Sequence, residues 1–72
     1  MSLGENIRER REKVGMTSTA LAGAAQVTVG AISQFESGRT IPNAYTFASI
    51  ARALGVTMDE LMNGEKPKEV RA

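Results

Sequence analysis

The residues best suited to chemistry in this 72-residue chain are small and uncharged, and they recur three and four positions apart near its middle. The set consists of Val29, Gly30, Ser33, Gln34 and Ser37. On a helix this spacing places them on one stripe of the surface. An amide such as Gln34 can form a bidentate pair with adenine, and an aliphatic side chain such as Val29 suits the methyl group of thymine. We therefore predict base contacts from Val29, Ser33 and Gln34, and a close approach of the duplex to the backbone at Gly30.

A second set of polar groups could donate hydrogen bonds to backbone phosphates, which position a protein on DNA without reading its sequence. The set consists of Thr17, Ser18, Thr28, Ser37, Arg39 and Asn43. Arg39 is its one cation, and backbone amides at the predicted helix starts near Thr17, Thr28 and Asn43 could add to it through the helix dipoles. With so few charges, we predict weak nonspecific binding and a shallow salt dependence.

Each of these residues also has an ordinary interpretation. Gln34 and Ser33 would be solvated helix residues in most proteins, Val29 a single exposed aliphatic side chain, and Gly30 a tolerated residue of a first turn. The basic residues Arg8, Arg10 and Lys13 are interpreted as helix-surface partners of Glu5, Glu9 and Glu12. The functional interpretation of the stripe therefore depends on the elements that would position it.

The chain pattern predicts five helices and no strand. They are expected over residues 3–14, 18–26, 29–36 and 44–54, with a short helix after Thr57. Their N-caps are predicted at Ser2, Thr17, Thr28, Asn43 and Thr57, with capping boxes formed by Glu5 and Glu60. Apolar residues at helical spacing give the predicted core: Leu3, Ile7, Val14, Leu21, Ala22, Ala25, Ile32, Phe35, Phe47, Ile50, Ala51, Leu54, Leu61 and Met62.

The second and third predicted helices are joined by only Gln26, Val27 and the cap Thr28. So short a link forces the two helices to cross steeply, with the small Ala22 at the contact. From Ser18 to Ser37 the sequence resembles the Cro-type, phage-repressor-like helix-turn-helix family, also called Xre-like. The resemblance continues through "IRERREKVGMT" and "IPNAYTFASIARALGVTMDELMNG" and so covers nearly the whole chain.

The resemblance implies an all-α, compact five-helix lambda-repressor-like DNA-binding domain over residues 1–63, followed by a polar tail or linker start over 64–72. In that family the third helix lies in the major groove and the second crosses above it. Two positions depart from the pattern: Gln26 stands where most relatives carry glycine in the turn, and Ser18 stands where most carry glutamine. A left-handed Gln26 would cost roughly 1–2 kcal/mol.

Glu36 lies in the last turn of the third predicted helix, where a carboxylate opposes the helix dipole unless a cation compensates it. The resemblance implies that this cation is Arg11 of the first helix. We expect a structural ion pair between Arg11 and Glu36 that fixes the first helix on the third.

The resemblance also implies a homodimer on a palindromic DNA site whose half-sites lie roughly 34 Å apart. The candidate interface lies in and before the fifth helix, at Val56, Met58, Leu61 and Met62. The alternative is that these residues only close the core.

Composition bounds the function. The chain has no cysteine and no histidine, which weighs against thiolate or imidazole metal sites and against an enzyme, so we expect no cofactor and no metal. No apolar run approaches the roughly 20 residues of a membrane span, and a cytoplasmic location is expected. The net charge of +1 neither requires nor forbids a polyanionic partner.

The leading expectation is a sequence-specific transcriptional regulator of double-stranded DNA, in the simplest case a repressor. The alternative is a protein-interaction module, antitoxin-like or a co-regulator, that keeps the fold with weak or no DNA binding. The sequence leaves open whether the chain represses or activates, whether it has a small-molecule effector, and whether it is a phage repressor, a restriction-modification controller or an antitoxin.

Overall fold

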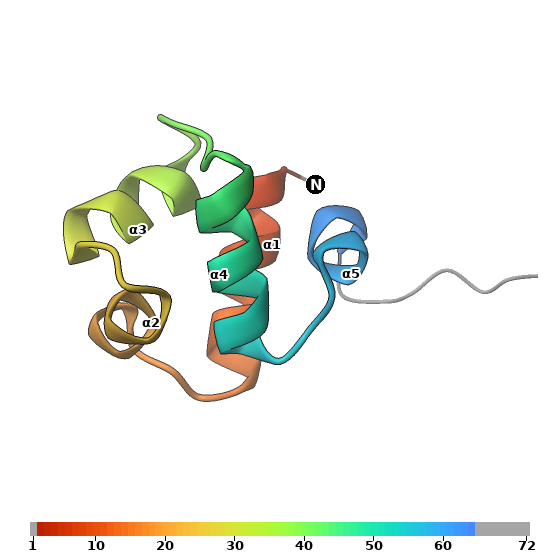
Figure 1. Ribbon diagram of the computed structural model, residues 1–72, viewed down its shortest axis with the longest axis horizontal. Coiled ribbons are helices and arrows are strands. Elements are labelled where there is room, and N and C mark those ends of the chain that lie inside the picture. The colour runs from red at the N-terminus through yellow and green to blue at the C-terminus, as the bar shows by residue number, and fades with distance from the viewer. Residues whose placement is uncertain (1, 65–72) are drawn as a thin grey trace, which may run out of the picture.

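The computed structural model describes residues 2–64, which form five helices and no strand (Figure 1). The helices are α1 (Leu3–Lys13), α2 (Ser18–Ala25), α3 (Val29–Ser37), α4 (Ala44–Leu54) and α5 (Met58–Asn63). Residues 65–72, and with them nearly all of the predicted tail, lie outside the described part of the chain. The predicted all-α, five-helix class is confirmed.

Every helix begins on the predicted cap. The side-chain oxygens of Ser2, Thr17, Thr28, Asn43 and Thr57 each accept a hydrogen bond from the backbone N–H three residues later, at 2.9–3.1 Å. Both capping boxes are present, because Glu5 and Glu60 accept the backbone N–H of their cap residues. Each such bond satisfies an N–H that the helix itself leaves without an acceptor.

One fully buried aliphatic side chain from each helix meets in the centre of the domain. These are Ile7, Leu21, Ile32, Ile50 and Leu61. Because every helix contributes to the same core, the five elements stabilise one another. Two predicted core residues are wrong: Val14 follows the last residue of α1 and is half exposed, and Met62 lies on the outer side of α5.

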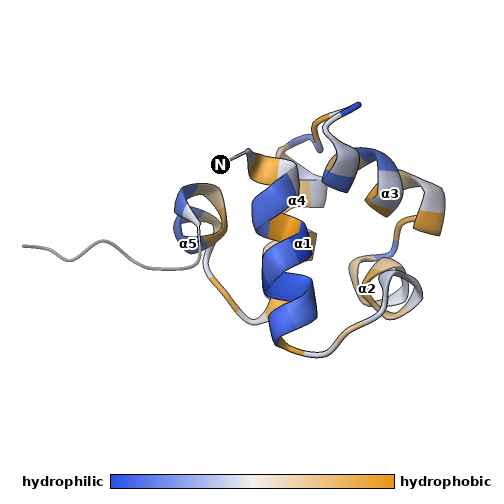
Figure 2. Ribbon diagram, turned by 180° about the vertical axis from the view of Figure 1, so that it is seen from behind, coloured by the Kyte–Doolittle hydropathy of each residue, from blue (hydrophilic) through white to orange (hydrophobic). Residues whose placement is uncertain are grey.

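In space, α1 and α4 lie between the α2–α3 pair on one side and α5 on the other (Figure 1). The α1 helix packs against α3 and α5, while α4 packs against α2 and α5. Seen from behind, α1 is hydrophilic along most of its exposed length, whereas α2 carries mainly neutral or apolar residues (Figure 2). Within residues 2–64, no helix combines the length and the apolar character that a membrane crossing requires.

Two buried residues of the first turn of α1 fix its neighbours. A Cβ atom on Gly4 would collide with the carbonyl oxygen of Phe35 and lie 2.8 Å from that of Glu36, so the start of α1 touches the backbone of α3. Asn6 donates from Nδ2 to the carbonyl oxygens of Leu61 and Met62, at 3.0 and 3.2 Å. These last-turn carbonyls have no acceptor role inside α5, so the amide ties α5 to α1.

Candidate functional site

The junction of α2 and α3 holds the two helices at a steep crossing: Figure 1 views α2 nearly along its axis, whereas α3 runs across the view. Gln26 ends α2 in the left-handed conformation, at φ 62° and ψ 45°, as its place in the turn predicts. The N–H of Val27 then donates to the carbonyl of Ala22 at 2.9 Å, and Thr28 caps α3 immediately afterwards. The side chains of Ala22 and Ala25 are buried at the contact.

We use the name α3 stripe for Val29, Gly30, Ser33, Gln34 and Ser37. All five residues are exposed, and the fully buried Ile32 lies on the opposite side of the helix. Val29 is 44% exposed, which is unusual for a branched aliphatic side chain next to a core. A Cβ atom on Gly30 would meet only the hydroxyl of Thr28, at 3.9 Å, so packing within the chain does not require a glycine there.

The expected ion pair of Arg11 and Glu36 is present and lies beneath the α3 stripe. Nε and Nη2 of Arg11 donate to the two carboxylate oxygens at 2.7 and 3.1 Å, and Nη1 donates to the carbonyl of Met16 at 3.0 Å. The side chains are only 13% and 11% exposed. Hydrogen bonding to Glu36 raises the pKa of Arg11 above its ordinary value. The pair therefore neutralises the one carboxylate of α3 and turns it away from the stripe.

The predicted phosphate donors fall into two groups. Thr17, Thr28 and Asn43 use their side-chain oxygens to cap helices, which leaves the hydroxyl protons and the amide group for a further acceptor. The hydroxyl of Ser37 already donates to the carbonyl of Gln34 at 3.1 Å, so Ser37 must rotate before it can donate elsewhere.

Arg39 is exposed directly beyond the left-handed Gly38 that ends α3. Its backbone N–H donates to the carbonyl of Gln34 at 3.0 Å, which fixes the turn at the end of the stripe. Ser18, by contrast, is partly buried in the first turn of α2.

The candidate dimer residues do not form one exposed group. Leu61 is 1% exposed and belongs to the core, so its side chain is not available to a partner and its place in the predicted interface is wrong. Val56 is partly buried against the same core. Met58 and Met62 remain exposed, at 40% and 57%.

Three positions with a clear role in the structure were not identified from the sequence. Gly4 carried a weak signal, since a glycine in the first turn of a helix lowers helix propensity without an evident reason. Asn6 was hidden because a polar residue beside apolar ones usually faces water. Arg8 was interpreted as a surface ion-pair partner, and its position relative to α2 and α3 could not be derived from spacing along one helix. Among the described residues, no group of acidic or cysteine side chains could hold a metal ion.

The helix-turn-helix family model matches residues 7–61, which is most of the chain. An HTH-type transcriptional regulator, DdrOP3 of Deinococcus deserti, is 41% identical over 64 residues, covering 89% of this chain and 50% of the relative. An HTH-type transcriptional activator, BcrR of Enterococcus faecalis, is 35% identical over 66 residues, covering 92% of this chain and 32% of the relative. The chain thus spans half the length of the first relative and about a third of the second.

Among solved structures, the c2 repressor of Salmonella phage P22, in complex with a synthetic operator, superposes with a TM-score of 0.83 at 35% identity. The match covers 90% of this chain and 98% of that one.

Proposed function

This chain belongs to the Cro/C1-type, phage-repressor-like helix-turn-helix family, and from that membership we propose that it is a sequence-specific transcriptional regulator of double-stranded DNA. The proposed mode of action is repression: a homodimer occupies a pseudo-palindromic operator and excludes polymerase. The proposal is supported by the names of its relatives, which are regulators and repressors, and by the operator complex of the P22 c2 repressor.

The observation that carries the proposal is the α3 stripe itself. An exposed helix face without charge, next to a steeply crossing helix, is the shape and chemistry that a major groove accepts. In the proposed complex the amide of Gln34 pairs with an adenine, and the methyl groups of Val29 contact a thymine methyl. Gly30 lets the backbone approach the base edges, and Ser33 adds an adaptable hydroxyl.

Phosphate contacts would flank the stripe on both sides. Arg39 supplies the cation beyond the end of α3, and the capped N-termini at Thr17, Thr28 and Asn43 supply partial positive charge. A single reading helix of nine residues offers few contacts, so we propose that two copies bind together through Met58 and Met62. Two copies related by a two-fold axis require a site with matching symmetry.

Selection of bound duplexes from a random DNA pool tests the proposal, because it reports site, symmetry and half-site spacing together. We expect one pseudo-palindromic motif with half-sites roughly 34 Å apart. Titration of that duplex should then show a loss of about 1–3 kcal/mol of binding free energy for Gln34→Ala and a uniform loss across sequences for Arg39→Ala. Asn63→Ala, which truncates an exposed amide on α5, is the matched control and should bind like the wild type.

The alternative, a protein-interaction module with the same fold, makes the opposite prediction. No enriched motif, together with equal binding by the wild type and Gln34→Ala, would reject the regulator proposal in favour of that module.

A further inference from the structure

A polar hollow of about 210 Å³ lies between α1, α2 and α3, directly beside the α3 stripe. Its lining consists of Arg8, Ser18, Ser33, Glu36 and Ser37. Ser33 and Ser37 belong to the stripe as well, so whatever occupies the hollow is adjacent to the bases that the stripe would contact. None of the functional roles assigned above uses Arg8.

The charge of this hollow is set by two ion pairs of unequal strength. Both carboxylate oxygens of Glu36 are taken by Arg11, so Glu36 adds little negative potential. Arg8 has only a loose partner: its Nε lies 3.8 Å from a carboxylate oxygen of Glu12, and the side chains are 56% and 64% exposed. Such an exposed pair is worth little and is readily exchanged for a better partner.

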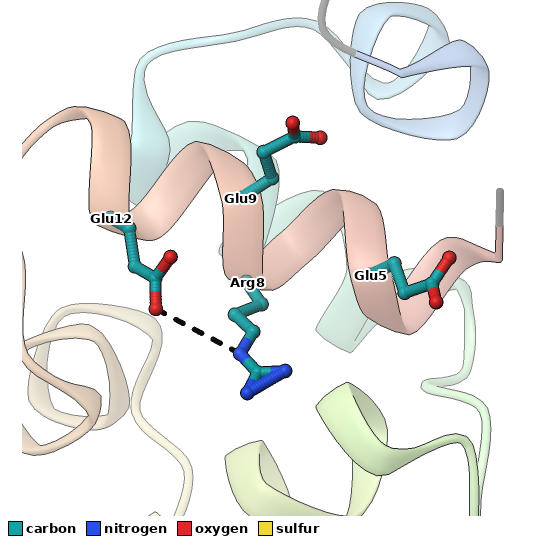
Figure 3. A pocket seen from close by; sticks show the side chains of 4 residues that line it. All are labelled: Glu5, Arg8, Glu9 and Glu12. Atoms are coloured by element: carbon teal, nitrogen blue, oxygen red, sulfur yellow. Dashed lines mark ion pairs between the residues drawn. The ribbon is translucent and has the colours of Figure 1, made fainter.

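The direction of the side chains distinguishes Arg8 from its acidic neighbours. In Figure 3, Arg8 extends from α1 toward α3, with Glu12 beside it, whereas Glu9 points away from α3. The guanidinium group is therefore held on the side of α1 that faces the hollow. A shallow depression on α1 shares Arg8, but its other lining residues are all acidic: Glu5, Glu9 and Glu12.

Neutral donors complete the hollow. Ser18 is the first residue of α2, where the backbone N–H groups have no acceptor within the helix and the helix dipole is positive. The hydroxyl of Ser18 and that of Ser33 come from two different helices and line the same space. A cation, two hydroxyl groups and a helix N-terminus together form a site for a tetrahedral oxyanion.

We propose that this hollow binds one phosphodiester of the DNA backbone, with Arg8 as the cationic ligand, and that Glu12 competes with the phosphate for Arg8. The inference deepens the proposed function, on which it rests. On binding, the guanidinium group exchanges the loose contact with Glu12 for a charge-assisted hydrogen bond to the phosphate. Arg8 would thereby become a second cation at the interface, on the side of the stripe opposite Arg39.

Substitution of Arg8 tests the proposal against the selected duplex, with Arg52→Gln as the control because Arg52 is exposed on α4 and lies outside the hollow. Arg8→Gln should weaken binding roughly tenfold, equally for all sequence variants of the site. The slope of log affinity against log salt should also become shallower by about 0.9 per half-site. Arg52→Gln should leave affinity and slope unchanged.

The competition by Glu12 gives a second, independent readout. Glu12→Gln should tighten binding several-fold more than Glu9→Gln, which removes the same charge from the same helix on the side away from α3. In an Arg8→Gln background, the extra gain from Glu12→Gln over Glu9→Gln should disappear, because the competed group is gone.

A neutral methylphosphonate placed at each backbone position in turn locates the contact. At one position it should weaken the wild type as much as Arg8→Gln does, and it should not weaken Arg8→Gln further. If the wild type binds DNA but Arg8→Gln keeps the same affinity and slope, the inference is wrong and the proposed function stands. If the wild type binds no DNA, both are wrong.

Discussion

Replacing Arg11 with methionine should destabilise the domain by about 3–5 kcal/mol, because the substitution leaves Glu36 as an uncompensated charge in a nearly buried position. The magnitude follows from the contacts that are lost: two charge-assisted hydrogen bonds to Glu36, at 2.7 and 3.1 Å, and one to the carbonyl of Met16 at 3.0 Å. A chain of 72 residues has a total unfolding free energy of about 4–11 kcal/mol. The substitution should therefore remove a third or more of the stability.

Urea denaturation followed by far-ultraviolet circular dichroism measures this loss, since the helical signal disappears on unfolding. The double variant Arg11→Met with Glu36→Gln should be more stable than Arg11→Met alone, because no charge is then left unpaired. Arg52→Met is the control for loss of an exposed arginine and should change stability by less than about 0.5 kcal/mol.

The pH dependence has a definite sign. Because the pKa of Arg11 is raised in the folded state, the stability it contributes is fully present below the unfolded pKa and is lost only as the pH rises through the folded value. Titration of Arg11 should therefore leave the cost of Arg11→Met constant from pH 7 to 10. A cost below about 1 kcal/mol, or a double variant no more stable than Arg11→Met, would refute this account of the pair.

Three further substitutions test the packing and backbone geometry, each by urea denaturation. Gly4→Ala should destabilise by about 1–3 kcal/mol, because the new methyl group meets the rigid backbone of α3, and an unchanged midpoint would contradict that contact. Gln26→Gly should stabilise by about 0.5–1 kcal/mol by relieving a left-handed side-chain residue, and a loss of stability would contradict the strain. Asn6→Ala should cost about 1–3 kcal/mol and expose α5 to faster hydrogen exchange, and unchanged protection of α5 would show that Asn6 does not tie it to α1.

Local signals in the sequence were sufficient for the helices and for the exposure of the α3 stripe. Caps act over three residues, and apolar spacing acts over one or two turns, so both are readable from neighbouring letters. The left-handed Gln26 could be placed from the family pattern of the turn. The pairing of Arg11 with Glu36 came from the resemblance, since nothing in the spacing joins residues 25 positions apart.

Contacts between distant segments account for what the sequence did not provide. Leu61 and Met62 are adjacent apolar residues on a one- to two-turn helix, and only the packing of α5 on α1 decides that the first enters the core and the second faces outward. The roles of Gly4 and Arg8 likewise depend on where α1 lies against α3. Side-chain direction on one helix is predictable, but the helix that it faces is not.

Intermolecular nuclear Overhauser effects in a complex of the isotope-labelled protein with its selected duplex test the central claim most directly. The account predicts contacts from the methyl groups of Val29 to a thymine methyl and from the side-chain amide of Gln34 to an adenine. Contacts to base protons that come only from other helices, or none from the α3 stripe in a specific complex, would contradict it.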